Sequence, residues 1–218
     1  MRMHFIPRAW FFAVAALLLL GPFAHAQNTN SSPGRDQGTP PTTVQQSDKV
    51  QNAQANTLQM ETEILSTIHA INQMEIKAGE IARNRGTTAQ IRQYGDRVAR
   101  DHTIADQNVM QLSKARGIKI VEPPPAANAD QQQKMQQQMA ALTELETLHG
   151  SDFDQKYLSW MEDGHKEAIE MLSQSVDKLP NSQVKRLVGN MVPVLIQHYQ
   201  IGSNLTIDRT VQRAGGGE

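Results

Sequence analysis

The sequence predicts an all-α protein, an antiparallel four-helix bundle with an extra connecting helix before the third long helix. Between residues 58 and 208, apolar side chains recur at alternating spacings of three and four, the period of a helix that buries one face. Gly86, Gly117, Gly150 and Pro180 interrupt this pattern at intervals of a helix length. Alternating β-branched segments, which would indicate strands, are nearly absent.

Five helices are expected from these interruptions. The second begins at a cap on Thr87 or Thr88, and the fourth begins at a cap on Ser151 or Asp152. Pro193 predicts a kink in the last helix. The expected segments are 58–84, 88–116, 128–148, about 151–178, and a last helix from the turn at 180–182 to about 208.

The N-terminal region has the pattern of an export signal. Basic residues precede an apolar run of about a dozen residues, and Ala24-His25-Ala26 then predicts cleavage before Gln27. The run is shorter than the ~20 residues that a membrane-spanning helix needs. We therefore expect a signal peptide at 1–26, a disordered leader at 27–57, a bundle at 58–208 and a flexible tail at 209–218. The expected location is periplasmic or secreted, without a transmembrane segment after cleavage.

Composition excludes several classes of function. The formal net charge is −1 and no basic block occurs, so nothing predicts binding to nucleic acid. Without cysteine, the bundle must be stabilised by its packed core alone. Sequence signatures of serine hydrolases, zinc proteases and phosphate-binding loops are also absent. Partners cannot be identified from the sequence; self-association and binding to another envelope protein both remain open.

Small residues and polar residues interrupt the predicted core faces. The small residues predict close approach of helices at their levels; they are Gly95, Ala105, Ala168 and Gly202. Each long helix also has one polar side chain with metal-binding capacity on its core face. These side chains are Glu75, His102, His165 and His198. His69 lies beside the first of these faces and is expected on a flank or at the surface.

The heights of the four polar residues along the bundle can be compared at ~1.5 Å rise per residue. Glu75 and His102 lie on either side of Gly86, and His165 and His198 lie on either side of Pro180, at comparable separations from these turns. The four levels roughly coincide whether the two turns lie at the same end or at opposite ends. The sequence therefore predicts one polar cluster in the core.

Two interpretations of this cluster remain open. Imidazole and carboxylate groups bind Fe, Zn, Mn, Cu or Ni, and Asp101 could then orient a ligand. Alternatively, the four side chains form a buried hydrogen-bonded network that fixes the register of the helices without a metal. The usual di-iron set is incomplete. Glu162 precedes His165 by three residues as that set requires, but neither His198 nor His102 has such a partner.

Four segments together resemble a known family. They begin with Gln73-Met74-Glu75 and Arg100-Asp101-His102, and they continue with residues 148–157 and with Gln197-His198. In order and spacing they are similar to the bacterial exported family called domain of unknown function 4142, often labelled as outer membrane proteins. The resemblance covers about 58–205 and implies a ferritin-like bundle without an agreed activity. The family pattern has an Asp-His pair on its third helix, whereas here Gly164 precedes His165.

Two functional hypotheses follow. The first is a binding, structural or stress-related envelope protein whose Glu/His cluster binds a transition metal ion or stabilises the core. The alternative is a metal-dependent redox enzyme of ferritin-like type. No residue is predicted to be catalytic on sequence grounds, and whether the protein is an enzyme stays open.

Overall fold

The structure is a computed structural model that describes residues 42–126 and 129–215. Side chains are described mainly between residues 47 and 208. This part of the chain consists of five helices and contains no strand. The predicted signal peptide and the leader up to residue 41 lie outside the described residues. No described helix is both long and apolar enough to cross a membrane. The helices are α1 (Thr42–Arg85), α2 (Ala89–Ala115), α3 (Ala129–Leu145), α4 (Gly150–Val176) and α5 (Ser182–Gly215).

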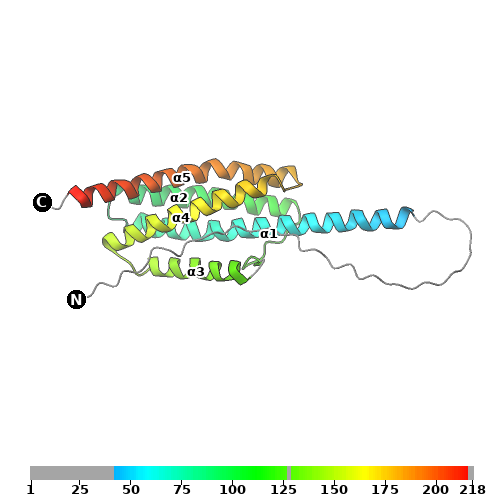
Figure 1. Cartoon of the computed structure of the whole chain (residues 1–218), viewed down its shortest axis with the longest axis horizontal. Coiled ribbons are helices and arrows are strands. Elements are labelled where there is room, and N and C mark those ends of the chain that lie inside the picture. Colours follow the sequence, from blue (N-terminus) through cyan, green and yellow to red (C-terminus); the bar gives the residue numbers. More distant parts are fainter. Residues whose placement is uncertain (1–41, 127–128, 216–218) are drawn as a thin grey trace, which may run out of the picture.

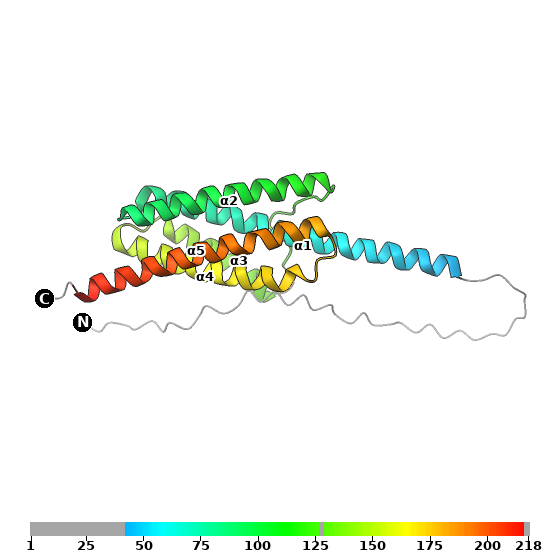
Figure 2. The same ribbon diagram turned by 90° about the horizontal axis from the view of Figure 1, so that it is seen from above.

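The four long helices lie side by side (Figures 1 and 2). Along the chain, with α3 included, consecutive helices run in opposite directions, so α2 and α4 are parallel (Figure 1). α1 packs along α2, and α4 packs along α5. The shorter α3 lies on the outside, against α1 and α4. Because α3 crosses back along the bundle, the α1–α2 turn and the α4–α5 turn lie at opposite ends (Figure 1).

The first helix begins earlier than predicted. It begins at Thr42 rather than at residue 58, and residues 47–56 are exposed on a segment that projects beyond the bundle (Figure 1). The expectation of a disordered leader is therefore wrong from residue 42 onward. The polar composition correctly excluded packing but not helix, because no Pro or Gly occurs between 42 and 57. Extending an existing helix also avoids the unfavourable nucleation step.

The other helix ends show which caps were predicted correctly. The Thr88 hydroxyl accepts a hydrogen bond from the Ile91 amide (3.3 Å), as expected at the start of α2. α2 ends before Gly117, whose φ of 66° requires the left-handed region that glycine adopts readily. α4 begins at Gly150 with His149 at the N-cap, so the expected cap at Ser151 or Asp152 is wrong.

The last helix is longer than expected. α5 continues through Pro193 and beyond residue 208 to Gly215. Its start is fixed by the Asn181 side-chain oxygen, which accepts hydrogen bonds from the amides of Gln183 (2.8 Å) and Val184 (3.2 Å). These bonds satisfy two amides that would otherwise lack partners in the first turn.

The buried apolar residues form two clusters, one toward each end of the bundle. The aromatic cluster contains Ala78, Ala82, Ile91, Tyr94, Val98, Leu142, Leu145, Phe153, Tyr157, Leu158, Trp160 and Met161. The aliphatic cluster contains Leu65, Ile68, Val109, Ile118, Ala168, Met171, Leu172, Leu179, Val184, Val188 and Leu195. On each of the four long helices, the predicted polar residue lies between the segments that contribute to the two clusters. The core is therefore divided by a polar layer.

Candidate metal centre

The polar layer consists of Glu75 from α1, His102 from α2, His165 from α4 and His198 from α5. All four side chains are buried, with exposed fractions between 0 and 4%. The structure thus brings together every residue that the sequence singled out as a candidate metal ligand. Each stands at a core position of its helix, so the same periodicity that buries the apolar neighbours also buries these groups.

The polar atoms of the layer are close enough to surround one ion. Glu75 Oε2 lies 2.6 Å from His102 Nε2 and 3.3 Å from His165 Nε2. His165 Nε2 lies 3.2 Å from His198 Nδ1. One ring nitrogen from each of the three histidines lies within 4.8 Å of the others. The three ring nitrogens therefore surround one common point, and the Glu75 carboxylate lies beside two of them.

The outward ring nitrogen of each histidine faces an acceptor. His102 Nδ1 lies 2.9 Å from the Asn72 side-chain oxygen, and His165 Nδ1 lies 2.7 Å from the Met161 carbonyl oxygen. A neutral imidazole has one N–H donor and one lone pair. If each outward nitrogen donates its N–H to that acceptor, the inward nitrogen presents a lone pair to the centre.

His198 is oriented in the same way by Asp101. Its Nε2 lies 3.0 Å from Asp101 Oδ2, which leaves Nδ1 directed toward His165. Asp101 is adjacent to His102 in sequence but contacts the histidine of a different helix. Its side chain is partly exposed, at 27%. A carboxylate that holds the far nitrogen of an imidazole is a common neighbour of histidine metal ligands.

Two buried atoms in the layer lack a hydrogen bond of acceptable geometry. They are Glu75 Oε2 and His102 Nε2, although they are only 2.6 Å apart. Leaving buried polar atoms without aligned partners costs free energy, and such atoms in a native core require an explanation. At 2.6 Å the two atoms are in ion-pair contact, and they would have to separate to roughly 3.3 Å to bind one metal ion between them.

The pKa values of the four groups show the balance of burial and charge. Burial raises the pKa of Glu75, but His102 and His165 outweigh burial and lower it to about 2. Burial lowers the pKa of His102, and the Glu75 charge reverses this, so the net pKa is raised. Burial dominates at the other two histidines, where the pKa of His165 is lowered and that of His198 falls to about 4. The layer thus favours one positive charge beside Glu75 and two neutral imidazoles.

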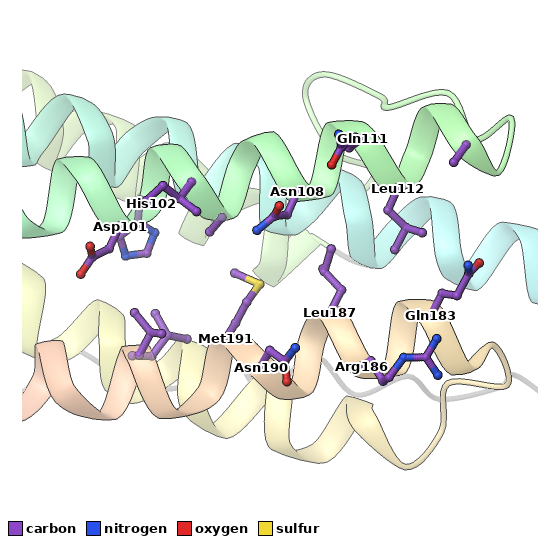
Figure 3. Close-up of a pocket in the computed structure, with 15 residues that line it drawn as sticks. Asp101, His102, Asn108, Gln111, Leu112, Gln183, Arg186, Leu187, Asn190 and Met191 are labelled. Atoms are coloured by element: carbon purple, nitrogen blue, oxygen red, sulfur yellow. The ribbon is translucent and has the colours of Figure 1, made fainter.

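A cleft of about 660 Å³ between α2 and α5 reaches the layer. Figure 3 shows Asp101 and His102 at one end of the cleft, and Gln183 and Arg186 at the other. Leu187 and Met191 project into it from α5, and Leu112 faces them from α2. A much smaller space of about 70 Å³ beneath α3 reaches Glu75. The layer is therefore buried but connected to the surface.

His69 was expected on a flank or at the surface; it lies to the side of the polar layer, but the expectation of a surface position is wrong. It is buried (8% exposed), with Nδ1 2.6 Å from Asp106 Oδ1 and Nε2 2.6 Å from Glu122 Oε1. Gln73 donates to the second oxygen of Asp106 at 2.8 Å. These contacts join α1 to α2 and to the connector after α2, and they are separate from the polar layer.

Asn72 and Tyr94 are two neighbours of the layer that the sequence did not single out. Asn72 precedes Glu75 by three residues, and this helical spacing could have placed it on the same face. The Tyr94 hydroxyl donates to the His198 backbone carbonyl at 3.0 Å. That contact joins residues 104 positions apart, and no local pattern could have shown it.

Comparisons with known proteins agree with the helical fold. A DUF305 fragment from Deinococcus radiodurans has a similar structure, with a TM-score of 0.58 and 14% identity over 67% of this chain and 95% of that one. A Streptomyces coelicolor structure described as "putative secreted protein DUF305" matches with a TM-score of 0.55 and 19% identity, over 70% of this chain and 92% of that one. No curated protein matches the chain. Residues 46–205 match the domain of unknown function DUF4142, and the chain therefore belongs to that family.

Proposed function

We propose that this protein is an exported, ferritin-like four-helix bundle that binds one transition metal ion through His102, His165 and His198, with Glu75 as the fourth ligand. The observation that carries the proposal is the orientation of the three imidazoles. Each outward nitrogen faces an acceptor, so the inward nitrogens of His165 and His198 present lone pairs to a buried point beside a carboxylate, and that of His102 does so once a metal displaces its proton. Lone pairs that face one another without a proton or a cation repel.

Two of the three short distances in the layer fit a metal site. Ligands at ~2.0–2.1 Å from a tetrahedral metal are roughly 3.3 Å apart. The separations of 3.3 Å for Glu75–His165 and 3.2 Å for His165–His198 are close to that value. The third distance, 2.6 Å between Glu75 Oε2 and His102 Nε2, is that of an ion pair, so a bound metal would replace this contact.

The ligand set limits the choice of metal. Imidazole nitrogen with one carboxylate suits Zn, Cu, Ni, Fe or Mn, and the chain has no cysteine to add a softer ligand. The di-iron set needs carboxylates on several helices. Glu162, which has the required spacing to His165, instead accepts a hydrogen bond from Ser203 at 3.1 Å. We therefore propose a single ion.

Metal titration of metal-free protein tests this proposal. Wild type should bind one equivalent of Zn²⁺, and Co²⁺ substitution should give the intense visible absorption of a tetrahedral site. His165→Gln should remove stoichiometric binding, while Asp101→Asn should weaken it about 10- to 100-fold by releasing His198. His149→Gln is the matched control, because that histidine is exposed and outside the layer. Helical circular dichroism must remain unchanged in each variant. Equal binding by wild type and His165→Gln, or no binding by wild type, would favour the structural network.

Export is proposed on two grounds. The segment 1–26 has the three-part pattern of a signal peptide. One structural relative is described as secreted. Intact mass of protein recovered from the periplasm should correspond to a chain that begins at Gln27; a mass that retains residues 1–26 would contradict this.

A metal-dependent redox enzyme is the second candidate, and the cleft is the observation that favours it. A cleft that ends at His102 could admit a small reactant to an ion that has only four protein ligands. Loading the protein with Fe²⁺ and exposing it to oxygen would separate the two functions. Repeated turnover would support the enzyme, whereas a stable stoichiometric complex would support binding alone.

A further inference from the structure

The α2/α5 cleft has features of a ligand site in its own right. Its volume of about 660 Å³ falls within the range of roughly 300–1,000 Å³ typical of small-molecule pockets. The α2 residues that line it span from Asp101 to Ala115, which corresponds to a length of about 20 Å at ~1.5 Å per residue. A long space between two helices favours an extended, unbranched ligand.

The walls of the cleft are mainly apolar. Leu112, Leu187 and Met191 project into it (Figure 3), and the buried Leu195 also lines it. At its rim, Ile104 remains 52% exposed and Val194 38% exposed. Covering these side chains with a hydrocarbon would contribute about 25 cal/mol per Å² of apolar surface removed from water.

Charge is distributed unevenly along the cleft. At the end near the start of α5, Arg186 is flanked in the lining by the side-chain amide of Gln183, with that of Asn190 one turn further on. Among the residues that the structure describes, no carboxylate lies within ion-pair distance of Arg186, whereas the neighbouring Lys185 is paired with Asp177 at 3.2 Å. The carboxylate at the other end, Asp101, already holds His198. The cleft thus offers an unpaired cation and amide donors at one end of an apolar channel.

We propose that the cleft binds a linear amphipathic monocarboxylate of medium chain length. Its carboxylate pairs with Arg186, and its hydrocarbon chain lies along Leu112, Leu187 and Met191 toward His102. A guanidinium matches a carboxylate in geometry as well as in charge, and side-chain amides supply further donors. This site does not depend on a bound metal, so it can be tested independently of the proposed metal centre.

The test uses metal-free, full-length protein and dodecanoate below its micellar concentration, with binding measured by calorimetry. Wild type should bind one equivalent. Arg186→Gln should weaken binding about 5- to 10-fold, because an exposed charge-assisted contact contributes modestly. Lys185→Gln is the matched control, since this adjacent cation lies outside the lining, and it should bind like wild type. Met191→Trp should fill the channel and remove binding.

Two further probes separate the headgroup from the chain. Dodecyltrimethylammonium carries the same hydrocarbon with the opposite charge and should bind at least 10-fold more weakly than dodecanoate. Acetate, which lacks the hydrocarbon, should not bind measurably.

The proposal is overturned if dodecanoate does not bind, if Arg186→Gln binds it as wild type does, or if the cationic probe binds equally well. A dimer that Met191→Trp dissociates but saturating dodecanoate does not would also overturn it, because a second copy would then occupy the cleft. Arg186 is exposed, so its variant keeps the test decisive even if Met191→Trp fails to fold.

Discussion

The two ends of the bundle, on either side of the Glu/His layer, are packed differently. At the aromatic end, α1 and α2 approach so closely that Gly79 and Gly95 face each other without side chains between them. There the Tyr94 ring also fills the space between α2 and α5 against Gly202, and its hydroxyl is bonded to the His198 carbonyl. At the aliphatic end, α2 and α5 leave the cleft of about 660 Å³.

This difference indicates how a buried polar layer can be both rigid and accessible. The tightly packed end fixes the backbone positions of the helices that carry the layer residues, while the cleft at the other end reaches His102. The aromatic end has a hollow of its own between α2 and α5, of about 730 Å³ and lined by arginines that include Arg92 and Arg97, but none of the four layer residues lines it. The two ends therefore differ in whether the space between α2 and α5 reaches the layer, not in whether such a space exists. The close packing that fixes the helices therefore lies at the aromatic end, and the cleft that reaches the layer lies at the aliphatic end.

The largest expected effect tests the tight end. In Gly95→Ala, the new Cβ would lie 2.7 Å from the Arg83 amide nitrogen and 2.7 Å from the Gly79 carbonyl oxygen, both backbone atoms that cannot rotate away. We expect the free energy of unfolding, measured with urea, to fall by about 3 kcal/mol.

Gly189→Ala in α5 is the matched control for this substitution. No atom lies within 4 Å of its ideal Cβ, so replacing glycine within a helix should stabilise the protein by roughly 0.5–1 kcal/mol. If the two substitutions had equal effects, close packing of α1 against α2 would not be the distinguishing feature of the aromatic end.

A second, smaller contrast compares a leucine from each end. Leu158 belongs to the aromatic cluster and is 2% exposed, so Leu158→Ala should cost about 3 kcal/mol of unfolding free energy. Leu187 is only partly buried on the wall of the cleft, and Leu187→Ala should cost about 1 kcal/mol because less apolar surface is lost from burial. Thermal and urea denaturation would measure both. A Leu187→Ala cost as large as that of Leu158→Ala would show that the cleft is closed in solution.

Much of the polar layer could be predicted because one rule governs it. Glu75, His102, His165 and His198 occupy core positions in a periodic pattern, and their comparable distances from the turns gave similar heights for either topology. Helical geometry is local, so the sequence was sufficient for that prediction. The identity of the outward acceptors was less accessible, because Met161 contributes a backbone carbonyl, which no residue type signals.

The cleft and the contacts of His69 could not be predicted, because both depend on residues from another part of the chain. Small residues were expected to mark close helix approach, and Gly95 does so, but Ala105 lines the cleft instead. The difference depends on the side chains of the opposite helix, which single-helix periodicity does not contain. His69 is buried because the connector after α2 folds back and brings Glu122 onto it, a non-local contact.

The smallest expected effect concerns the polar layer between the two ends, in metal-free protein. The folded-state pKa of His198 is about 4 and that of His165 is also lowered, against ~6.5 in an unfolded chain. Their contribution to stability is therefore complete above about pH 6.5 and is lost as the pH falls toward 4, because the unfolded chain then binds more protons. His102 has the opposite sign: its raised pKa gives stability that is present below about pH 6.5 and lost at higher pH.

His165, His198 and Glu75 all have lowered pKa values and His102 alone has a raised one, so the free energy of unfolding should fall by about 1 kcal/mol between pH 7 and pH 4.5. Glu75 contributes only near the lower pH, where the unfolded carboxyl begins to bind a proton and the folded one, with a pKa of about 2, does not. Urea denaturation at the two pH values would measure the change, and His198→Gln should reduce it because one of the groups that titrate in this direction is removed. His149→Gln, at an exposed position, should leave it unchanged.

A wild-type stability that rises on acidification would mean that the His102–Glu75 pair dominates the layer. The layer would then hold its positive charge without a metal, and the separation between a rigid end and an accessible end would no longer point to a metal centre.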